Sequence, residues 1–217
     1  MTDVVIFDLD GVIVDSEPVW ELVRRRYVDE RGGRWQPDTQ RRLMGMSTRE
    51  WARYLSAELG VDRSPEQVAT DVIEEMARRY AERVPLIDGA DKVIRELAAH
   101  WTLGLASSSP TRLIEAALAA TGLADVFAVT LSTERVSRGK PSPDVYVSVA
   151  RRLDADPVNC VAVEDSSNGV RSAAAAGMRV LAVPNTDYPL DPDARDQATL
   201  VLSSITDLTE GTIRALV

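Results

Sequence analysis

Residues 4–17 read Val-Val-Ile-Phe-Asp-Leu-Asp-Gly-Val-Ile-Val-Asp-Ser-Glu, and this stretch decides the fold. Its apolar start predicts a short buried strand that runs into Asp8, Asp10 and Gly11. Two carboxylates this close together are costly to bury unless a cation compensates them, and Mg²⁺ prefers hard oxygen ligands. Asp8 can then attack phosphorus while Asp10 gives a proton to the leaving oxygen and later takes one from water. A pair of loop-capping aspartates is the structural alternative.

Further along the chain, short β-branched runs alternate with amphipathic helical periodicity, which is typical of a parallel sheet covered by helices. The sequence therefore predicts an α/β fold with a Rossmann-like parallel sheet flanked by helices. The expected strands are residues 4–7, 103–106, 127–129, 161–163, 180–183 and, more weakly, 200–202, and the expected helices include 90–99, 112–120 and 143–152. Polar residues that end such strands can reach a ligand beyond the carboxyl edge of the sheet.

The first gap between strands breaks this alternation. Residues 15–85 contain no convincing strand, only helix-like segments at 19–31, 48–59 and 65–83. About 70 residues is far more than a crossover needs. We therefore expect a catalytic core made of residues 1–14 and 86–217, and a helical cap inserted at 15–85. A cap over a strand-end site would exclude water and contact the substrate.

Composition limits the class of protein. The chain has 217 residues, a formal net charge of −9 and scattered basic residues, which argues against a nucleic-acid partner. One cysteine, Cys160, rules out an internal disulfide and favours a reducing cytoplasm. Neither a signal peptide nor an apolar run of membrane-spanning length is evident, so we expect a soluble protein with no membrane contact.

Two further strand ends carry polar residues. Glu164 and Asp165 follow the predicted strand 161–163 and can complete a Mg²⁺ site with the first aspartates, although Asp165 can also simply cap the next helix. Ser107 and Ser108 follow the strand 103–106, where hydroxyl and backbone N–H groups can hold a phosphate at a helix N-terminus. An ordinary helix start with serine and proline is the alternative interpretation.

Lys140 lies in Arg-Gly-Lys-Pro-Ser-Pro-Asp, residues 138–144. The chain has 25 basic residues, and only Lys92 and Lys140 are lysines. A lysine kept beside glycine and proline in such a sequence favours a role for a compact ammonium, which can balance phosphoryl oxygens and clustered aspartates. A surface lysine without function is the other possibility.

In order, Asp8/Asp10, Ser107, Lys140 and Glu164/Asp165 resemble the four motifs of the haloacid dehalogenase superfamily, across nearly the whole chain. The helical insert resembles the small cap of the β-phosphoglucomutase-like phosphatases. This resemblance implies Mg²⁺ and phosphorylated small molecules as substrates.

The resemblance also implies the site roles. By it, Asp8 is the nucleophile, Asp10 the acid/base, and Ser107 and Lys140 the phosphate binders. Asp8, Asp165 and the backbone carbonyl of Asp10 would hold the metal, with Glu164 assisting through water. Small-capped relatives are often monomers, and we expect the same here.

Departures within the family narrow the chemistry. Dehalogenases lack an acid/base aspartate at the position of Asp10, and the phosphonate-cleaving relatives use a cap lysine, whereas no lysine precedes Lys92 here. The β-phosphoglucomutases carry a histidine near the position of Trp20, but the only histidine of this chain is His100, which we expect at an exposed helix end. These departures favour hydrolysis over mutase activity.

The insert offers three candidate substrate residues. Trp20, in a segment that resembles the sugar-phosphate phosphatases, can stack on a sugar ring or only pack the cap. In the segment 43–50, Ser47 and Arg49 match a Gly-x-Ser loop and an arginine that face the substrate in related enzymes. Arg49 can fork onto phosphate or sugar oxygens. Ser47 with Glu50 also fits a helix-capping box.

The sequence thus predicts a Mg²⁺-dependent phosphatase that passes a phosphoryl group through an aspartyl-phosphate on Asp8, with sugar phosphates as its substrates. A phosphohexomutase is the alternative within the class. A phospho-aspartate acceptor switch is the alternative outside it, although such a switch needs neither Asp10 nor a cap. The polar stretch 185–197 is expected to be a surface loop of unknown role.

Overall fold

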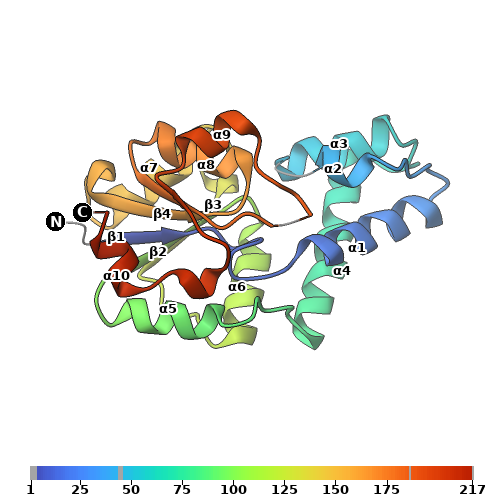
Figure 1. Ribbon diagram of the computed structural model, residues 1–217. Coiled ribbons are helices and arrows are strands. Elements are labelled where there is room, and N and C mark those ends of the chain that lie inside the picture. Colours follow the sequence, from blue (N-terminus) through green and yellow to red (C-terminus); the bar gives the residue numbers. More distant parts are fainter. Residues whose placement is uncertain (1–3, 44–45, 186, 217) are drawn as a thin grey trace.

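The computed structural model describes residues 4–43, 46–185 and 187–216 and shows a parallel sheet flanked by helices (Figure 1). In chain order the helices and strands are β1 (Val4–Phe7), α1 (Glu17–Glu30), α2 (Thr39–Leu43), α3 (Thr48–Ala57), α4 (Pro65–Glu82), α5 (Ala90–Ala98), β2 (Thr102–Ser107), α6 (Thr111–Thr121), β3 (Val129–Ser132), α7 (Asp144–Arg152), β4 (Cys160–Glu164), α8 (Ser167–Ala175), β5 (Arg179–Ala182), α9 (Pro192–Gln197), β6 (Leu200–Val201) and α10 (Glu210–Arg214). The predicted α/β class is confirmed.

The sheet has six parallel strands in the order β3-β2-β1-β4-β5-β6. β1 lies between β2 and β4, and Phe7 pairs with Leu105 on one side and Val163 on the other. Because all strands run in the same direction, their carboxyl ends meet at one edge of the sheet. The chain order reverses beside β1, so the loop after β1 opens in the middle of that edge.

The two faces of the sheet bury different helices. Val5 and Phe7 belong to the hydrophobic core that includes α5 and α6, whereas Val4 and Ile6 pack with α7 and α8. This alternation follows from the period of two in a strand, and a fully apolar strand such as β1 is what a sheet covered on both faces requires.

The insert is made of α1 to α4 and lies beyond the tip of β1 in Figure 1. The chain enters and leaves it at one place, where Val14 forms an antiparallel bridge with Leu86 and the amide of Asp15 donates to the carbonyl of Pro85 at 2.8 Å. Two capping boxes start its helices, Ser47 with Glu50 for α3 and Ser64 with Gln67 for α4. We propose that this crossing bounds a cap made of residues 15–85.

Two expected elements differ from the structure. The third strand was predicted at 127–129 but is Val129–Ser132, because Phe127 instead packs edge-on against Phe7, with ring centroids 6.1 Å apart, before the strand begins. The stretch 185–197 was predicted to be a surface loop, but its last part is the short helix α9, which starts with Pro192 at its first position. Of the helices described here, none is long and apolar enough to cross a membrane.

Candidate active site

Three neighbouring strands deliver the polar groups of the site. Asp8 follows β1, Ser107 ends β2 and Glu164 ends β4. The strand register brings these ends side by side, and the amide of Asp8 continues the pairing by donating to the carbonyl of Val163 at 2.9 Å. Residues more than 90 positions apart in sequence therefore share one edge of the sheet.

Lys140 is buried at the centre of this edge. Its ammonium donates to Asp8 Oδ1 and to Glu164 Oε1, both at 2.6 Å, and to the carbonyl of Ala106 at 3.0 Å. The side chain of Lys140 is 4% exposed and that of Glu164 is fully buried. Burial lowers the pKa of Lys140, but the carboxylates of Asp8 and Glu164 outweigh that effect and raise it overall, so the ammonium stays charged.

The single ammonium does not balance the acidic groups around it. One oxygen from each of Asp8, Glu164 and Asp165 lies within 4.8 Å of the others, and all three residues are buried. Burial raises the pKa of Asp8 to about 8 against the opposing effect of Lys140, and burial with repulsion from Glu164 raises the pKa of Asp165 well above its usual range. Excess negative charge on hard oxygen donors fits a divalent cation such as Mg²⁺.

Gly11 makes room for this cluster. Its φ is +78°, and a Cβ at this position would lie 1.9 Å from Oδ2 of Asp165. A side chain at residue 11 would therefore collide with the carboxylate, so the glycine after Asp10 is required by both backbone conformation and space.

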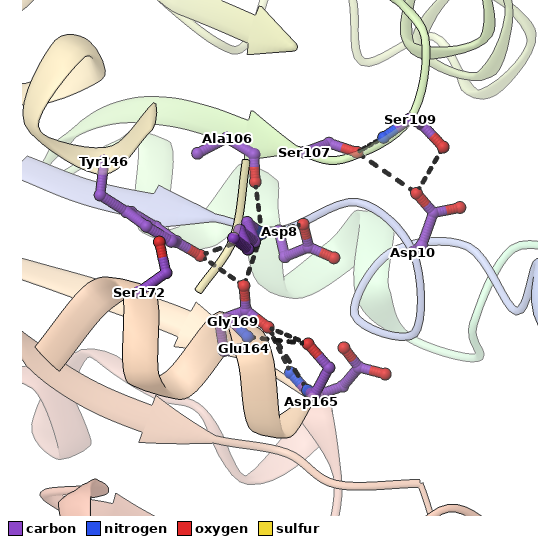
Figure 2. A network of polar contacts seen from close by, with 12 residues as sticks. Asp8, Asp10, Ala106, Ser107, Ser109, Tyr146, Glu164, Asp165, Gly169 and Ser172 are labelled. Carbon is purple, nitrogen blue, oxygen red and sulfur yellow. Dashed lines mark hydrogen bonds and ion pairs between the residues drawn. The ribbon is translucent and has the colours of Figure 1, made fainter. Parts of the chain in front are cut away.

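Asp10 is held by hydroxyl groups rather than by a charge. Ser16 donates to its Oδ1 at 2.5 Å, and Ser109 and Ser107 donate to its Oδ2 at 2.7 and 3.3 Å. Figure 2 shows Ser107 at the end of β2 and Ser109 just beyond it, both reaching toward Asp10. The amide of Ser109 also donates to Ser107 Oγ at 2.9 Å. Three hydroxyl groups thus fix the orientation of the Asp10 carboxyl group.

The Glu164 side chain is held at both of its oxygens. Oε1 accepts from Lys140 and, at 2.7 Å, from the hydroxyl of Tyr146, while Oε2 accepts from the amide of Asp165 at 3.2 Å and the hydroxyl of Ser166 at 3.2 Å (Figure 2). Gly169 allows this arrangement, because a Cβ there would lie 1.9 Å from the Glu164 carboxyl carbon. With its oxygens engaged in this way, Glu164 mainly orients Lys140 and the loop that carries Asp165.

A cavity of about 580 Å³ lies over the sheet edge. Asp8, Asp10, Ser108, Lys140 and Asp165 line it from the core. The remaining lining residues come from the insert, from the loop before α6, from the loop into α8 and the first turns of α8, and from the loop before α9: Glu17, Trp20, Arg24, Arg41, Leu43, Met46, Trp51, Ser109, Pro110, Ser166, Ser167, Asn168, Arg171, Asp187, Tyr188, Pro189 and Asp191. The insert and the 187–191 loop therefore form walls that face the strand ends.

The three candidate substrate residues of the insert lie in different places. Trp20 is buried and lines the cavity. Ser47 forms the capping box of α3 with Glu50, and Arg49 is exposed on that helix; neither lines the cavity as described. Two residues of the Gly-x-Ser segment, Met44 and Gly45, lie outside the described residues.

Sequence reasoning missed several residues of the site. Ser109 and Ser16 hold Asp10, Tyr146 holds Glu164, and Glu17 and Arg24 line the cavity from α1. Ser109 could have been predicted from the sequence, because it directly follows the selected Ser107 and Ser108. Tyr146 carried no local signal, since in sequence it is one more apolar residue on the buried face of α7.

Comparison with known proteins agrees with this geometry. Residues 5–183 match the family described as haloacid dehalogenase-like hydrolase. Hexitol phosphatase B of Escherichia coli K12 is 34% identical over 94% of this chain and 93% of its own length. The bifunctional riboflavin kinase/FMN phosphatase of Arabidopsis thaliana is 28% identical over 96% of this chain, which spans only 55% of that relative.

A solved structure supports the same assignment. The crystal structure of CbbY from Rhodobacter sphaeroides in complex with phosphate superimposes with a TM-score of 0.85, at 27% identity and over 96% of each chain. The family match covers the sheet from β1 to the end of β5 and includes the strand ends that carry Asp8, Ser107 and Glu164. The chain belongs to the haloacid dehalogenase-like hydrolases.

Proposed function

We propose that this phosphatase of phosphate monoesters is Mg²⁺-dependent and hydrolyses small phosphorylated metabolites, with sugar phosphates as its main substrates, through an aspartyl-phosphate on Asp8. The observation that carries the proposal is the grouping of Asp8, Asp10 and Lys140 with the carboxylate cluster at the floor of one cavity. The name of the related hexitol phosphatase B supports the sugar-phosphate class.

The metal would be held by Asp8, Asp165 and the backbone carbonyl of Asp10, with Glu164 assisting through water. The buried carboxylates and the raised pKa of Asp165 support this assignment, because both indicate that the cluster lacks positive charge. When bound, a divalent cation supplies charge that screens the repulsion between the Asp8 carboxylate and an anionic substrate.

Asp8 is arranged as a nucleophile. Lys140 fixes its Oδ1 at 2.6 Å, and within the described part of the chain Oδ2 accepts no hydrogen bond and is available to attack phosphorus. The phosphoryl group would be bound by Lys140 together with Ser107 and Ser108, of which Ser108 lines the cavity. The ammonium would stay close to the phosphoryl oxygens and stabilise the charge that develops on them.

Asp10 would transfer the protons. It lies on the cavity floor, oriented by three hydroxyl groups, and would donate a proton to the leaving alcohol as Asp8 attacks. It would then accept a proton from the water that hydrolyses the aspartyl-phosphate. The cap would close for the first half of the reaction and open for water and product exchange. Trp20, which lines the cavity, would contact the substrate; the structure gives less support for Ser47 and Arg49.

Phosphohexomutase activity is the alternative within this family. Position 20 in the first cap helix is Trp20 rather than a histidine, and His100 lies two residues after the end of α5, where its Nε2 is 3.3 Å from Oε2 of Glu210. We therefore favour hydrolysis. A phospho-aspartate acceptor switch is less consistent with a cavity of about 580 Å³ and with the oriented Asp10.

The test is a panel of sugar phosphates, hexitol phosphates and phosphorylated acids, assayed for free phosphate with Mg²⁺ and with a chelator. We expect Mg²⁺-dependent release of phosphate. Isomerised sugar phosphate without net release would establish the mutase instead, and a long-lived acyl-phosphate without release would establish the switch.

A further inference from the structure

Arg24 is a buried cation that the proposed chemistry does not use. It lies on α1 of the insert, is 5% exposed and lines the cavity. Its guanidinium carbon is 4.3 Å from the ring centroid of Trp20 and 5.0 Å from that of Trp51. The two indole rings, with centroids 6.0 Å apart, hold the guanidinium in place through cation–π contacts.

Among the described residues, the guanidinium of Arg24 has no hydrogen-bond or ion-pair partner. Its Nε is buried without a hydrogen bond, and within the described part of the chain Arg24 forms no hydrogen bond and no ion pair within 4.0 Å. Leaving a buried donor without an acceptor costs free energy. A ligand in the cavity that presents oxygen acceptors would remove that cost.

Glu17 lies on the same face of the same helix, about two turns earlier. Its Oε2 accepts from the side-chain amide of Gln40 at 2.5 Å, and in the described residues Oε1 has no partner. Glu17 and Asp10 both line the cavity, and both carboxylates oppose the effect of burial, which lowers the pKa of Arg24 to about 10. The wall opposite the phosphate site thus offers a donor and an acceptor close to Asp10.

We propose that Arg24 and Glu17 form a hydroxyl-binding site for the leaving group, in which Arg24 donates to a substrate oxygen and Glu17 accepts from a substrate O–H. This inference rests on the proposed function, because the leaving group must lie beside Asp10. A hydroxyl group both accepts and donates, so one hydroxyl or two neighbouring hydroxyls satisfy the pair. The substrate class that follows is a phosphorylated polyol or sugar.

The negative charge around this part of the cavity disfavours substrates that carry a second anionic group. Glu17 and Asp10 lie near Arg24, and Asp187 lines the cavity from the facing loop. Arg171 adds little attraction for an anion, because its guanidinium is paired with Asp191 and Asp193 at 2.7 Å each. Among the described residues that line the cavity, the exposed Arg41 is the one remaining arginine that could attract an anion.

The experiment compares three probes: a hexitol 6-phosphate, n-hexyl phosphate, which lacks hydroxyls, and phosphoglycolate, which carries a carboxylate. Wild type should give a kcat/KM for the hexitol phosphate at least about tenfold above that for either other probe. Arg24→Met should reduce the preference for the hexitol phosphate over n-hexyl phosphate by about 10- to 100-fold, the effect of losing a charged hydrogen bond. Glu17→Gln should also reduce this ratio of the two kcat/KM values. Arg24→Lys should keep a larger part of the ratio than Arg24→Met does.

Arg25→Gln is the matched control, because Arg25 is the exposed neighbour of Arg24 on α1. Its ratio of kcat/KM for the hexitol phosphate to kcat/KM for n-hexyl phosphate should equal that of wild type. Equal losses on the hexitol phosphate and n-hexyl phosphate in Arg24→Met would overturn the inference and leave Arg24 a packing role. Phosphoglycolate as the best wild-type substrate, with the largest loss in Arg24→Met, would overturn it in favour of an anion site. If wild type released phosphate from none of the probes or the wider panel, the proposed function itself would fail.

Discussion

Two buried cations, one on each side of the cavity, differ in their hydrogen-bond partners. Lys140 at the sheet edge is 4% exposed as a side chain and donates to two carboxylates and a carbonyl within 3.0 Å. Arg24 in the insert is 5% exposed and has cation–π contacts with two indoles, but among the described residues it forms no hydrogen bond and no ion pair within 4.0 Å. One cation is satisfied by the protein, and the other is positioned but unsatisfied.

The difference separates chemistry from recognition. A group that stabilises developing charge must be fixed before the substrate arrives, and Lys140 is fixed by its partners. A group that selects a leaving group contributes most when its hydrogen bonds form with the ligand alone. On the proposed mechanism, the sheet edge would carry out the reaction and the wall of the insert would select the substrate.

Asp8→Asn should abolish the chemistry that we propose for the sheet edge. Loss of the nucleophilic oxygen should lower kcat by at least about 10⁴-fold, a loss of the size found when a nucleophile is removed. Free phosphate from a hexitol phosphate in Mg²⁺ measures it. Asp125→Asn, at an exposed aspartate, is the control and should keep full activity. Turnover by Asp8→Asn within about tenfold of wild type would exclude Asp8 as the nucleophile.

Lys140→Met and Arg24→Met should differ in stability. Removing Lys140 leaves the buried carboxylates of Asp8 and Glu164 without their cation, which should lower the free energy of unfolding by about 3–5 kcal/mol. Removing Arg24 breaks no hydrogen bond or ion pair among the described residues and loses only its cation–π contacts with Trp20 and Trp51, so the loss should be smaller, about 1 kcal/mol. Urea denaturation of both variants measures the difference. Equal losses would show that Arg24 also has partners in the folded protein.

Mg²⁺ should stabilise the sheet edge through Asp165. A ligand at a hundred times its Kd adds about 2.7 kcal/mol, which for a chain of this size raises Tm by about 5–10 °C. Thermal denaturation with Mg²⁺ and with a chelator measures the shift. Asp165→Asn should lose most of it, while Asp125→Asn should keep it. An unchanged shift in Asp165→Asn would place the stabilising cation elsewhere in the protein.

The sequence predicted the sheet edge well because its information is local. Asp8, Ser107 and Glu164 each end or follow a short apolar strand, and parallel strands bring such ends together whatever their separation in sequence. No strand directly precedes Lys140, so its position gave no such signal. It was selected because only two of the 25 basic residues are lysines.

The cavity wall was predicted less well because it depends on tertiary packing. Arg24 lies in a run of three arginines that suggests solvent-exposed ion pairs, and only the approach of Trp20 and Trp51 reveals that it alone of the three is buried. Likewise, Asp187 and Asp191 read as part of a polar surface loop, yet both line the cavity. Helical periodicity indicates which face is buried but not what that face contacts.

An exposed ion pair on the outer surface of the insert should contribute least to stability, in contrast to the buried ion pairs of Lys140. Glu75 on α4 accepts from Arg78 Nη2 at 2.7 Å and from Arg79 Nε at 2.8 Å, and these bonds, led by that from Arg78, lower its pKa to about 2. A lowered carboxyl pKa gives stability that is present above the usual value of 4.5 and is lost as the pH falls toward 2. Because Arg78 is 56% exposed, solvent screens the pair.

Glu75→Gln should therefore lower the free energy of unfolding at pH 7 by less than about 1 kcal/mol, and the gap to wild type should narrow as the pH falls from 4.5 toward 2. Urea denaturation across that range measures it, with Glu115→Gln, an exposed glutamate on α6 of the core, as the control. About 1 M salt should shrink the effect further. A loss as large as that of Lys140→Met would contradict the comparison, because an ion pair on the surface would then stabilise the fold as strongly as the buried one.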